Sequence, residues 1–262
     1  SEDAIARTTS VRDLLEEVTQ SRGDAAVERQ HILDDPEGAL TEEQKLWLQP
    51  QSIVQNAIGR LIYATTWLIM SLLFRLDVRG RDNLPETGPY VLTPNHVSYL
   101  DPFALAASLE YRRMRTTYWA GWTDILFTNW FVRQFSRIAQ VVPIDPERAV
   151  GSSLAFGGAV LARSLMLVWF PEGGRSQTGR LQAFKPGLGM LLDRFRVPVL
   201  PVTIEGAYEA LPPHRRFPRV FPIRVTIHPA VDPQTLEEKG QGKDGAERIM
   251  SGLQQHMAGF MQ

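Results

Sequence analysis

The stretch "GPYVLTPNHVSYLD", residues 88–101, joins a short apolar run to a polar turn and then to a helix signal. Its "YVLTP" segment (90–94) has the length and the side chains of a buried strand. The pair Asp101-Pro102 is typical of a helix start, with aspartate as the cap and proline at the first helical position. The stretch therefore predicts a strand, a turn that holds His96, and a helix that begins at Asp101.

The chain after Val78 continues this alternation of strands and helices. Further strands are expected at 139–144, 164–170, 198–204 and 223–227, and helices at about 101–110, 122–137, 146–163 and 185–195. This order predicts an α/β fold with a mixed sheet flanked by helices. In such sheets, functional loops gather at the carboxyl ends of the strands. Two candidate loops, "NHVSYLD" (95–101) and "PEGGRS" (171–176), each follow a predicted strand directly.

Residues 1–50 differ in charge from the rest of the chain. They hold 12 acidic and 5 basic side chains, whereas residues 51–262 hold 17 acidic and 23 basic ones. We expect residues 1–50 to form a helical appendage or linker, with capping boxes at Ser10 with Asp13 and at Thr41 with Gln44. The basic remainder suits anionic partners such as phosphates or an acidic membrane surface, and no aromatic–basic pattern favours nucleic acid. The opening "SEDAIARTTS" is polar and lacks methionine, so we expect a processed chain or a piece of a longer polypeptide.

Residues 51–76 form the most apolar part of the sequence. A run of 14 uncharged residues, 61–74, lies between two arginines, which is short of the ~18–20 residues that a membrane-crossing helix needs. The segment fits either a buried core helix or a helix in the membrane plane, with Tyr63 and Trp67 at the interface. We expect the second, and hence a monotopic or peripheral protein on the cytoplasmic face of a membrane. The aromatic stretch 118–135 fits a second membrane-facing wall or a buried aromatic core equally well.

The residue types in the two candidate loops narrow the chemistry. The chain has no cysteine, which excludes a cysteine nucleophile, and its five histidines lack ligand-like spacing, so we expect no metal site. An aspartate that binds one ring nitrogen of His96 would leave the other free as a general base, since imidazole has an unperturbed pKa near 6.5. The alternative is that Asp101 only caps a helix and His96 fills the loop.

The second loop, "FPEGGRS" (170–176), offers groups that bind anions. Its two glycines let the backbone turn sharply and expose N–H groups. Arg175 could hold a phosphate through two hydrogen bonds, and Glu172 stands beside it. A plain turn with a surface arginine remains the alternative interpretation.

Together these motifs resemble those of the glycerolipid acyltransferases, the superfamily of lysophosphatidic acid and glycerol-phosphate acyltransferases. "NHVSYLD" is similar to their NHxxxxD motif and "FPEGGRS" to their FPEGxRS motif. "FKPG" (184–187) and "VPVLPVTI" (197–204) are similar to later family segments, and the resemblance covers roughly residues 75–230. The family's second motif is altered here, because "QVVPIDPER" (140–148) has its arginine, Arg148, two residues late.

The resemblance implies a membrane-associated O-acyltransferase with residues 77–262 as its catalytic domain. A fatty acyl group would pass from acyl-CoA or acyl-carrier protein to the hydroxyl of a lysophospholipid such as 1-acylglycerol-3-phosphate, in phospholipid biosynthesis, with no other cofactor. His96 would be the base and Asp101 its orienting partner. The substrate-binding residues would be Glu172, Gly173, Arg175, Arg148 and Lys185, with backbone donors near Gly173 binding the oxyanion. A CoA-independent transacylase, an enzyme for another lysolipid, and a non-catalytic lipid-docking module of a larger protein remain alternatives.

Overall fold

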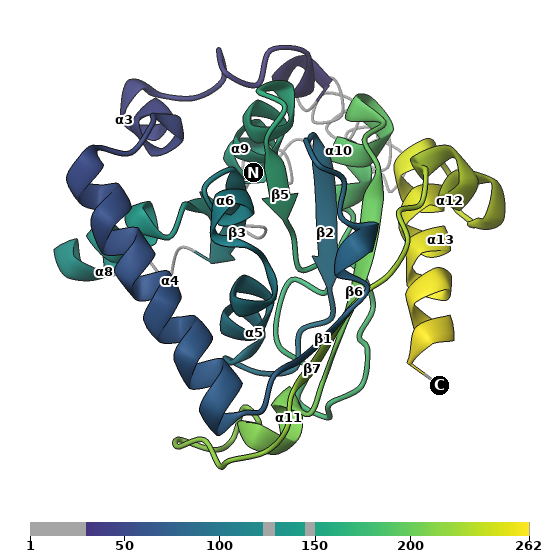
Figure 1. Ribbon diagram of the computed structural model, residues 1–262. Coiled ribbons are helices and arrows are strands. Elements are labelled where there is room, and N and C mark those ends of the chain that lie inside the picture. Colours follow the sequence, from purple (N-terminus) through teal and green to yellow (C-terminus); the bar gives the residue numbers. More distant parts are fainter. Residues whose placement is uncertain (1–29, 123–128, 145–149, 262) are drawn as a thin grey trace, which may run out of the picture.

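A central sheet of seven strands organises the described part of the chain, which in this computed structural model comprises residues 30–122, 129–144 and 150–261. The strands are β1 (Asp77–Arg79), β2 (Tyr90–Pro94), β3 (Thr117–Trp122), β4 (Val141–Ile144), β5 (Met166–Val168), β6 (Val199–Glu205) and β7 (Arg224–Ile227). They lie in the order β1-β7-β6-β2-β5-β3-β4, in which β7 runs antiparallel to β6 and the strands from β6 to β4 are parallel (Figure 1). The predicted α/β fold with a mixed sheet is confirmed.

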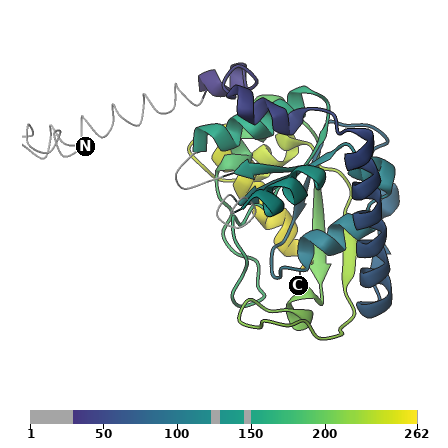
Figure 2. The same cartoon turned by 90° about the vertical axis from the view of Figure 1, so that its left-hand side faces the viewer.

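Helices cover both faces of this sheet. They are α3 (Glu42–Lys45), α4 (Ile53–Leu73), α5 (Asp101–Ser108), α6 (Tyr111–Met114), α8 (Trp130–Ile138), α9 (Val150–Ala162), α10 (Gly187–Phe195), α11 (Ala207–Ala210), α12 (Pro233–Lys239) and α13 (Gly245–Phe260), with short 3₁₀ turns at Leu46–Leu48 and Arg81–Asn83. Strand side chains alternate between the faces, so Val91 packs with α9, α10 and α13, whereas Leu92 packs with α5 and the end of α4. Figures 1 and 2 show α4 and α13 on opposite sides of the sheet.

The predicted elements differ from the observed ones mainly between residues 110 and 140. β2 has the predicted bounds, but residues 117–122, where the sequence predicts no strand, form β3. Aromatic side chains favour strands, and β3 lies between β4 and β5 with Tyr118 and Trp119 buried. The helix predicted at 122–137 is described only from α8 onward, where Asn129 caps it by accepting a hydrogen bond from the Val132 N–H at 3.0 Å.

Residues 30–50 pack against the sheet's α9 face. Leu33, Leu40 and Leu48 are buried there, and Glu37 pairs with Arg163 at 2.6 Å. The capping box predicted at Thr41 is confirmed, because Thr41 and Gln44 exchange hydrogen bonds. The box predicted at Ser10 lies outside the described residues.

Helix α4 lies along the outside of the molecule (Figure 2). Met70 is its one buried residue, so the buried-core interpretation of this segment is wrong. Its large exposed side chains are Ile53, Val54, Ile58, Leu61, Trp67, Leu68, Ile69, Leu72 and Leu73. Tyr63, expected at a membrane interface, turns inward, and its hydroxyl donates to the Leu109 carbonyl at 2.7 Å. Within residues 30–122, 129–144 and 150–261, no helix combines the length and the apolar character needed to span a bilayer.

Candidate active site

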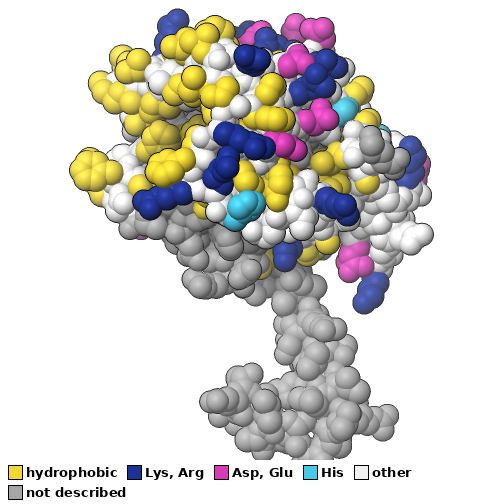
Figure 3. All heavy atoms as spheres, turned by 90° about the horizontal axis from the view of Figure 1, so that it is seen from below, with side chains coloured by type: hydrophobic (Ala, Val, Ile, Leu, Met, Phe, Trp, Pro, Cys, Tyr) yellow, Lys and Arg dark blue, Asp and Glu magenta, His cyan; other side chains and the backbone are white. Residues whose placement is uncertain are grey.

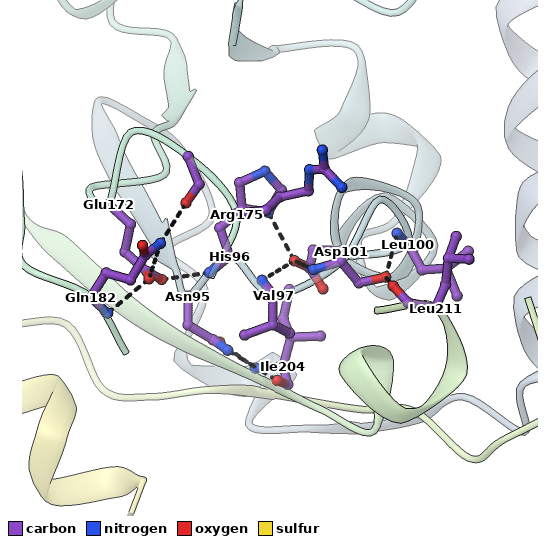
Figure 4. Close-up of polar contacts among 12 residues, drawn as sticks. Asn95, His96, Val97, Leu100, Asp101, Glu172, Arg175, Gln182, Ile204 and Leu211 are labelled. Carbon is purple, nitrogen blue, oxygen red and sulfur yellow. Dashed lines mark hydrogen bonds and ion pairs between the residues drawn. The ribbon is translucent and has the colours of Figure 1, made fainter. Parts of the chain in front are cut away.

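The two candidate loops meet at one edge of the sheet. Because β2 and β5 are parallel neighbours, the loops that follow them emerge side by side. The Ser176 N–H donates to the His96 carbonyl at 2.7 Å, and the His96 N–H donates to Glu172 Oε1 at 2.6 Å. Figure 4 shows the side chains of both loops converging around His96. The sheet thus brings together residues that are far apart in sequence.

His96 and Asp101 make the contact that the sequence suggested. The ring Nδ1 of His96 lies 2.8 Å from Asp101 Oδ2. The same oxygen accepts the N–H groups of Val97 at 2.6 Å and Ser98 at 2.7 Å. Asp101 is not the helix cap that we predicted, because it is the first residue of α5 and Leu100 occupies the cap position. Its carboxylate turns back into the preceding loop, where three donors hold it.

The surroundings of the pair leave one ring nitrogen available. Asp101 is fully buried, which raises the pKa of its carboxyl, while the hydrogen bonds from His96 and from the two backbone N–H groups oppose that rise. The imidazole packs against the Phe170 ring, with 4.3 Å between centroids. Among the described residues, Nε2 of His96 has no hydrogen-bond partner, and the ring lines a cavity. A ring that is oriented at Nδ1 and free at Nε2 can accept a proton from a molecule in that cavity.

The Glu172 carboxylate links two backbone segments by hydrogen bonds. Its Oε1 accepts from the His96 N–H, and its Oε2 accepts from the Gln182 N–H at 2.9 Å and from Gln182 Nε2 at 3.3 Å. Burial raises the pKa of the Glu172 carboxyl, and these hydrogen bonds oppose the rise. Both carboxylate oxygens are therefore engaged within the protein, which favours a positioning role over the substrate contact that we predicted.

The two glycines of the second loop have different environments. Gly173 has φ +68°, and a Cβ there would lie 2.9 Å from Lys185 Cγ, whereas a Cβ on Gly174 would meet nothing within 4 Å. The Gly173 N–H donates to the Phe170 carbonyl at 3.1 Å, so the expected backbone donors near Gly173 do not include its own N–H. Within the described part of the chain, the N–H groups of Gly174 and Arg175 make no hydrogen bond and are the better candidates for binding an oxyanion.

Arg175 brings a cation with an unused donor to the site. Its guanidinium carbon lies 3.4 Å from the centroid of the Tyr99 ring. Its Nη1 is buried and lacks a hydrogen-bond partner among the described residues, an arrangement that favours an anionic ligand. Lys185 is exposed and lines the same cavity. Arg148 lies outside the described residues.

A cavity of about 530 Å³ opens beside His96. Apolar side chains from α4, α5, β3 and α8 form much of its wall, among them Ile62, Phe103, Trp119 and Ile138. The polar side chains of His96, Arg175 and Lys185 line it as well. Such a cavity suits a ligand with a long apolar part and an anionic group. No group of three or more metal-binding side chains occurs within the described ranges.

Sequence reasoning overlooked four residues that shape this site. Asn95 holds the turn against β6, because its side chain accepts the Ile204 N–H at 2.7 Å and donates to the Ile204 carbonyl at 3.1 Å. Ser98 donates to the Leu211 carbonyl at 2.7 Å. Both follow a buried strand inside the quoted motif, where a buried polar side chain needs a partner. No sequence pattern marks Tyr99 or Gln182 as a site residue, because their contacts form only when the fold brings distant segments together.

Known proteins share this architecture and these segments. The 1-acyl-sn-glycerophosphate acyltransferase PlsC of Thermotoga maritima has the same fold, with a TM-score of 0.61 over 79% of this chain and 81% of its own, at 23% identity. The chloroplastic 1-acyl-sn-glycerol-3-phosphate acyltransferase BAT2 of Brassica napus is 30% identical over 156 residues, which are 57% of this chain and 43% of that protein. The 1-acyl-sn-glycerol-3-phosphate acyltransferase alpha of Mus musculus is 28% identical over 62% of this chain and 56% of its own.

The chain spans about half the length of these two relatives. The family model described as Acyltransferase matches residues 75–205, half of the chain and the part that carries both loops, and the chain therefore belongs to this acyltransferase family.

Proposed function

We propose that this chain transfers a fatty acyl group from an acyl thioester to the hydroxyl of a lysophospholipid such as 1-acylglycerol-3-phosphate. The observation that carries the proposal is the His96–Asp101 pair, held at 2.8 Å, in which His96 keeps its second ring nitrogen without a partner among the described residues and lines a largely apolar cavity. The relatives named above are 1-acyl-sn-glycerol-3-phosphate acyltransferases, which supports this substrate class. The acyl donor in the proposal is acyl-CoA or acyl-carrier protein.

The proposed reaction is a direct transfer in which the chain supplies a base. Nε2 of His96 takes the proton of the acceptor hydroxyl, whose oxygen forms a bond to the thioester carbonyl carbon. The carbon–sulfur bond then breaks, and the leaving thiolate takes the proton from the imidazolium. Asp101 keeps Nδ1 protonated, so that Nε2 starts as the acceptor. The N–H groups of Gly174 and Arg175 are positioned as candidate donors to the carbonyl oxygen as it gains charge.

The acceptor's phosphate is assigned to the part of the cavity that Arg175 and Lys185 line. Arg175 has a buried donor without a partner among the described residues, and a buried donor gains most from a charged acceptor. Lys185 lines the same cavity and offers a second cation. Arg148 stays in the proposal as a third cation, on sequence grounds alone. Glu172 takes a positioning role, since it fixes the backbone of His96.

The exposed apolar side chains support attachment to a membrane surface through residues 51–76. Trp130 and Phe131 of α8, a helix that contacts α4, are 65% and 77% exposed. Large apolar side chains exposed in such numbers mark an interaction site. Residues 77–262 form the proposed catalytic domain, and the cytoplasmic leaflet is the proposed location. Residues 1–50 are the proposed acidic appendage, of which residues 30–50 pack on the α9 face of the domain.

The test is acyl transfer by the purified chain from acyl-CoA or acyl-carrier protein to 1-acylglycerol-3-phosphate. The released thiol can be followed with a thiol reagent, because the chain has no cysteine to react. His96→Ala should lower the rate at least ~10²-fold, the low end for the loss of a general base. The matched control is His31→Ala, since His31 is exposed and distant in sequence from both loops.

The melting temperature of His96→Ala should stay within a few degrees of the wild type, because the residue lies in a loop. A variant that keeps more than half of the wild-type rate would contradict the base mechanism, and loss of the fold would indicate a structural histidine instead.

The acceptor is tested with a pair of substrates that differ only in the phosphate. Arg175→Ala should raise the KM for 1-acylglycerol-3-phosphate about tenfold or more and leave that for monoacylglycerol nearly unchanged, since a charge-assisted hydrogen bond contributes ~1.5–3 kcal/mol. The control is Arg180→Ala, an exposed arginine in the following segment. Equal effects on both acceptors would argue against phosphate recognition by Arg175.

A further inference from the structure

A short loop between α11 and β7 exposes aromatic and basic side chains together. This basic-aromatic loop, "PPHRRFPRVFP", comprises residues 212–222 and has no acidic residue. Phe217 is 73% exposed and Val220 67%, although burial of such side chains is favourable. The three arginines of the loop, Arg215, Arg216 and Arg219, are also exposed. Exposed apolar side chains rimmed by cations mark an interaction surface, and the site described above does not use them.

The loop is anchored at both ends. At its carboxyl end, the Ile223 N–H donates to the Phe74 carbonyl, at the end of α4, at 2.8 Å. At its amino end, the Leu211 carbonyl accepts the Ser98 hydroxyl at 2.7 Å, which ties the loop to the turn that holds His96. A further backbone hydrogen bond, from the Arg219 N–H to the Ala210 carbonyl at 2.9 Å, closes the loop on itself. These bonds set the position of the loop relative to α4 and to the turn that holds His96.

We propose that the basic-aromatic loop is a second membrane contact, which binds the surface of a bilayer that contains anionic lipid. Phe217 and Val220 enter the apolar boundary layer, and Arg215 and Arg216 contact lipid phosphates. The inference rests on the proposed function in one respect, namely that α4 faces a membrane. The positive charge of the loop favours anionic lipid as its partner, since an arginine can bind a phosphate through two hydrogen bonds.

Two observations favour a bilayer over an acidic protein as the partner. The loop ends beside the carboxyl end of α4, to which the Ile223 N–H is hydrogen-bonded, and the exposed side chains of α4 are largely apolar. Figure 3 views the molecule from the side on which α11 and the candidate loops lie, and shows hydrophobic side chains gathered over part of that face with lysine and arginine side chains beside them. Apolar side chains next to cations match the layers of a membrane interface, in which the lipid chains lie beside the phosphates.

The loop would determine how the protein is oriented on the membrane. Attachment through α4 and the neighbouring α8 alone leaves the tilt of the molecule on the membrane weakly fixed, whereas a further contact beside the end of α4 restricts it. Because the loop is bonded to Ser98, the fixed orientation includes the turn that carries His96. We infer that the loop keeps the cavity turned toward the bilayer, from which a lysolipid enters.

The experiment measures binding of the full chain to vesicles of neutral phosphatidylcholine and to vesicles that also contain an anionic phospholipid. Arg215→Gln/Arg216→Gln should weaken binding to the anionic vesicles about 10- to 30-fold, since one cation near such a surface contributes about fivefold, and should change neutral binding little. Added salt should shrink this difference. Phe217→Ser/Val220→Ser should weaken binding to both kinds of vesicle. Lys239→Gln/Lys243→Gln is the matched control, because it removes two exposed charges near α12 and should bind like the wild type.

The outcomes separate this inference from the proposed function. If the wild type binds neither kind of vesicle, the proposed membrane attachment and this inference both fail. If the wild type binds and the loop variants bind equally well, the loop inference alone is overturned. Loop variants that bind normally but lose activity only with acyl-carrier protein would identify an acidic protein as the partner, against the inference. Vesicle binding that depends on the loop, in a chain without acyl transfer, would support the inference and contradict the proposed activity.

A water-soluble acceptor provides a final check. Loop variants should acylate a short-chain acceptor at the wild-type rate, because their defect lies in reaching the membrane. A comparable loss with the soluble acceptor would show that the substitutions disturb the site itself, which would overturn the inference.

Discussion

The guanidinium carbon of Arg175 lies 3.4 Å from the centroid of the Tyr99 ring, so that a tyrosine of the first loop supports the cation of the second. Tyr99 is 46% exposed and makes no side-chain hydrogen bond among the described residues. Its contribution to the site is therefore its ring face, on which a guanidinium is stabilised by about 0.5–2 kcal/mol.

We expect Tyr99→Ala to raise the KM for 1-acylglycerol-3-phosphate between about threefold and tenfold, because Arg175 loses the ring that orients it. Tyr99→Phe keeps a ring at the same place and should stay within about twofold of the wild type. Initial rates with both acceptors, with and without phosphate, measure this. A phenylalanine variant as impaired as the alanine one would mean that the hydroxyl, and not the ring face, matters.

We expect Asp101→Asn to lower kcat at least ~10²-fold with little change in KM. An asparagine oxygen at the Oδ2 position can still accept from Val97, Ser98 and the His96 ring, but it carries no negative charge to stabilise the imidazolium that forms during transfer. Its NH₂ would lie at the buried Oδ1 position, which has no hydrogen-bond partner among the described residues. Steady-state kinetics check the effect, and thermal unfolding monitors the fold. A variant that retains the wild-type kcat would show that the reaction does not depend on the charge of Asp101.

The neighbouring glycines allow a matched comparison of stability. Gly173→Ala should lower the free energy of unfolding by ~1–2 kcal/mol relative to Gly174→Ala, because Gly173 has φ +68° and its Cβ would meet the Lys185 side chain. Both substitutions restrict the unfolded chain equally, so their difference reports on the folded state. Urea denaturation measures both values. Equal stabilities would show that the turn relaxes to accept a side chain.

His228 provides a pH-dependent prediction away from the site. Burial lowers its pKa, the charge of His256 lowers it further, and Glu205 acts in the opposite direction. A histidine with a lowered pKa in the folded state contributes stability above its unfolded value near 6.5, and this stability is lost as pH falls through the folded pKa. The free energy of unfolding should thus decrease between about pH 7.5 and pH 5, and His228→Gln should decrease less. An exposed-site control, His31→Gln, should keep the wild-type slope, and an unchanged slope in His228→Gln would refute the assignment.

The fold could be predicted where strands are apolar throughout. β2 and β6 lie between other strands with both faces covered. Their runs of valine, leucine and isoleucine predict buried strands, as observed. β3 was missed because Ala120 and Gly121 interrupt its aromatic residues, and both residue types are depleted in strands. The strand is favoured there because it pairs with β4 and β5. A local sequence pattern carries no information about such neighbours.

The contacts within the candidate site could be predicted only in part. The His96–Asp101 contact followed from the loop between a strand and a helix. The inward turn of Glu172 did not, because it depends on backbone N–H groups that the sheet brings within reach. The same holds for Tyr99, which meets Arg175 only when the two loops lie side by side.

The hydrogen bonds that hold the turn around His96, residues 95–101, have a consequence for how the chain folds. The bond from His96 to Glu172 joins residues 76 positions apart, and the bond from Ile204 to Asn95 joins residues 109 positions apart. Contacts of such long range form slowly, because the intervening chain must first be closed into a loop, whereas helices such as α4 and α13 depend on local contacts. During refolding, helical signal should therefore return before the turn is ordered. Enzymatic competence would be among the last properties that the chain regains.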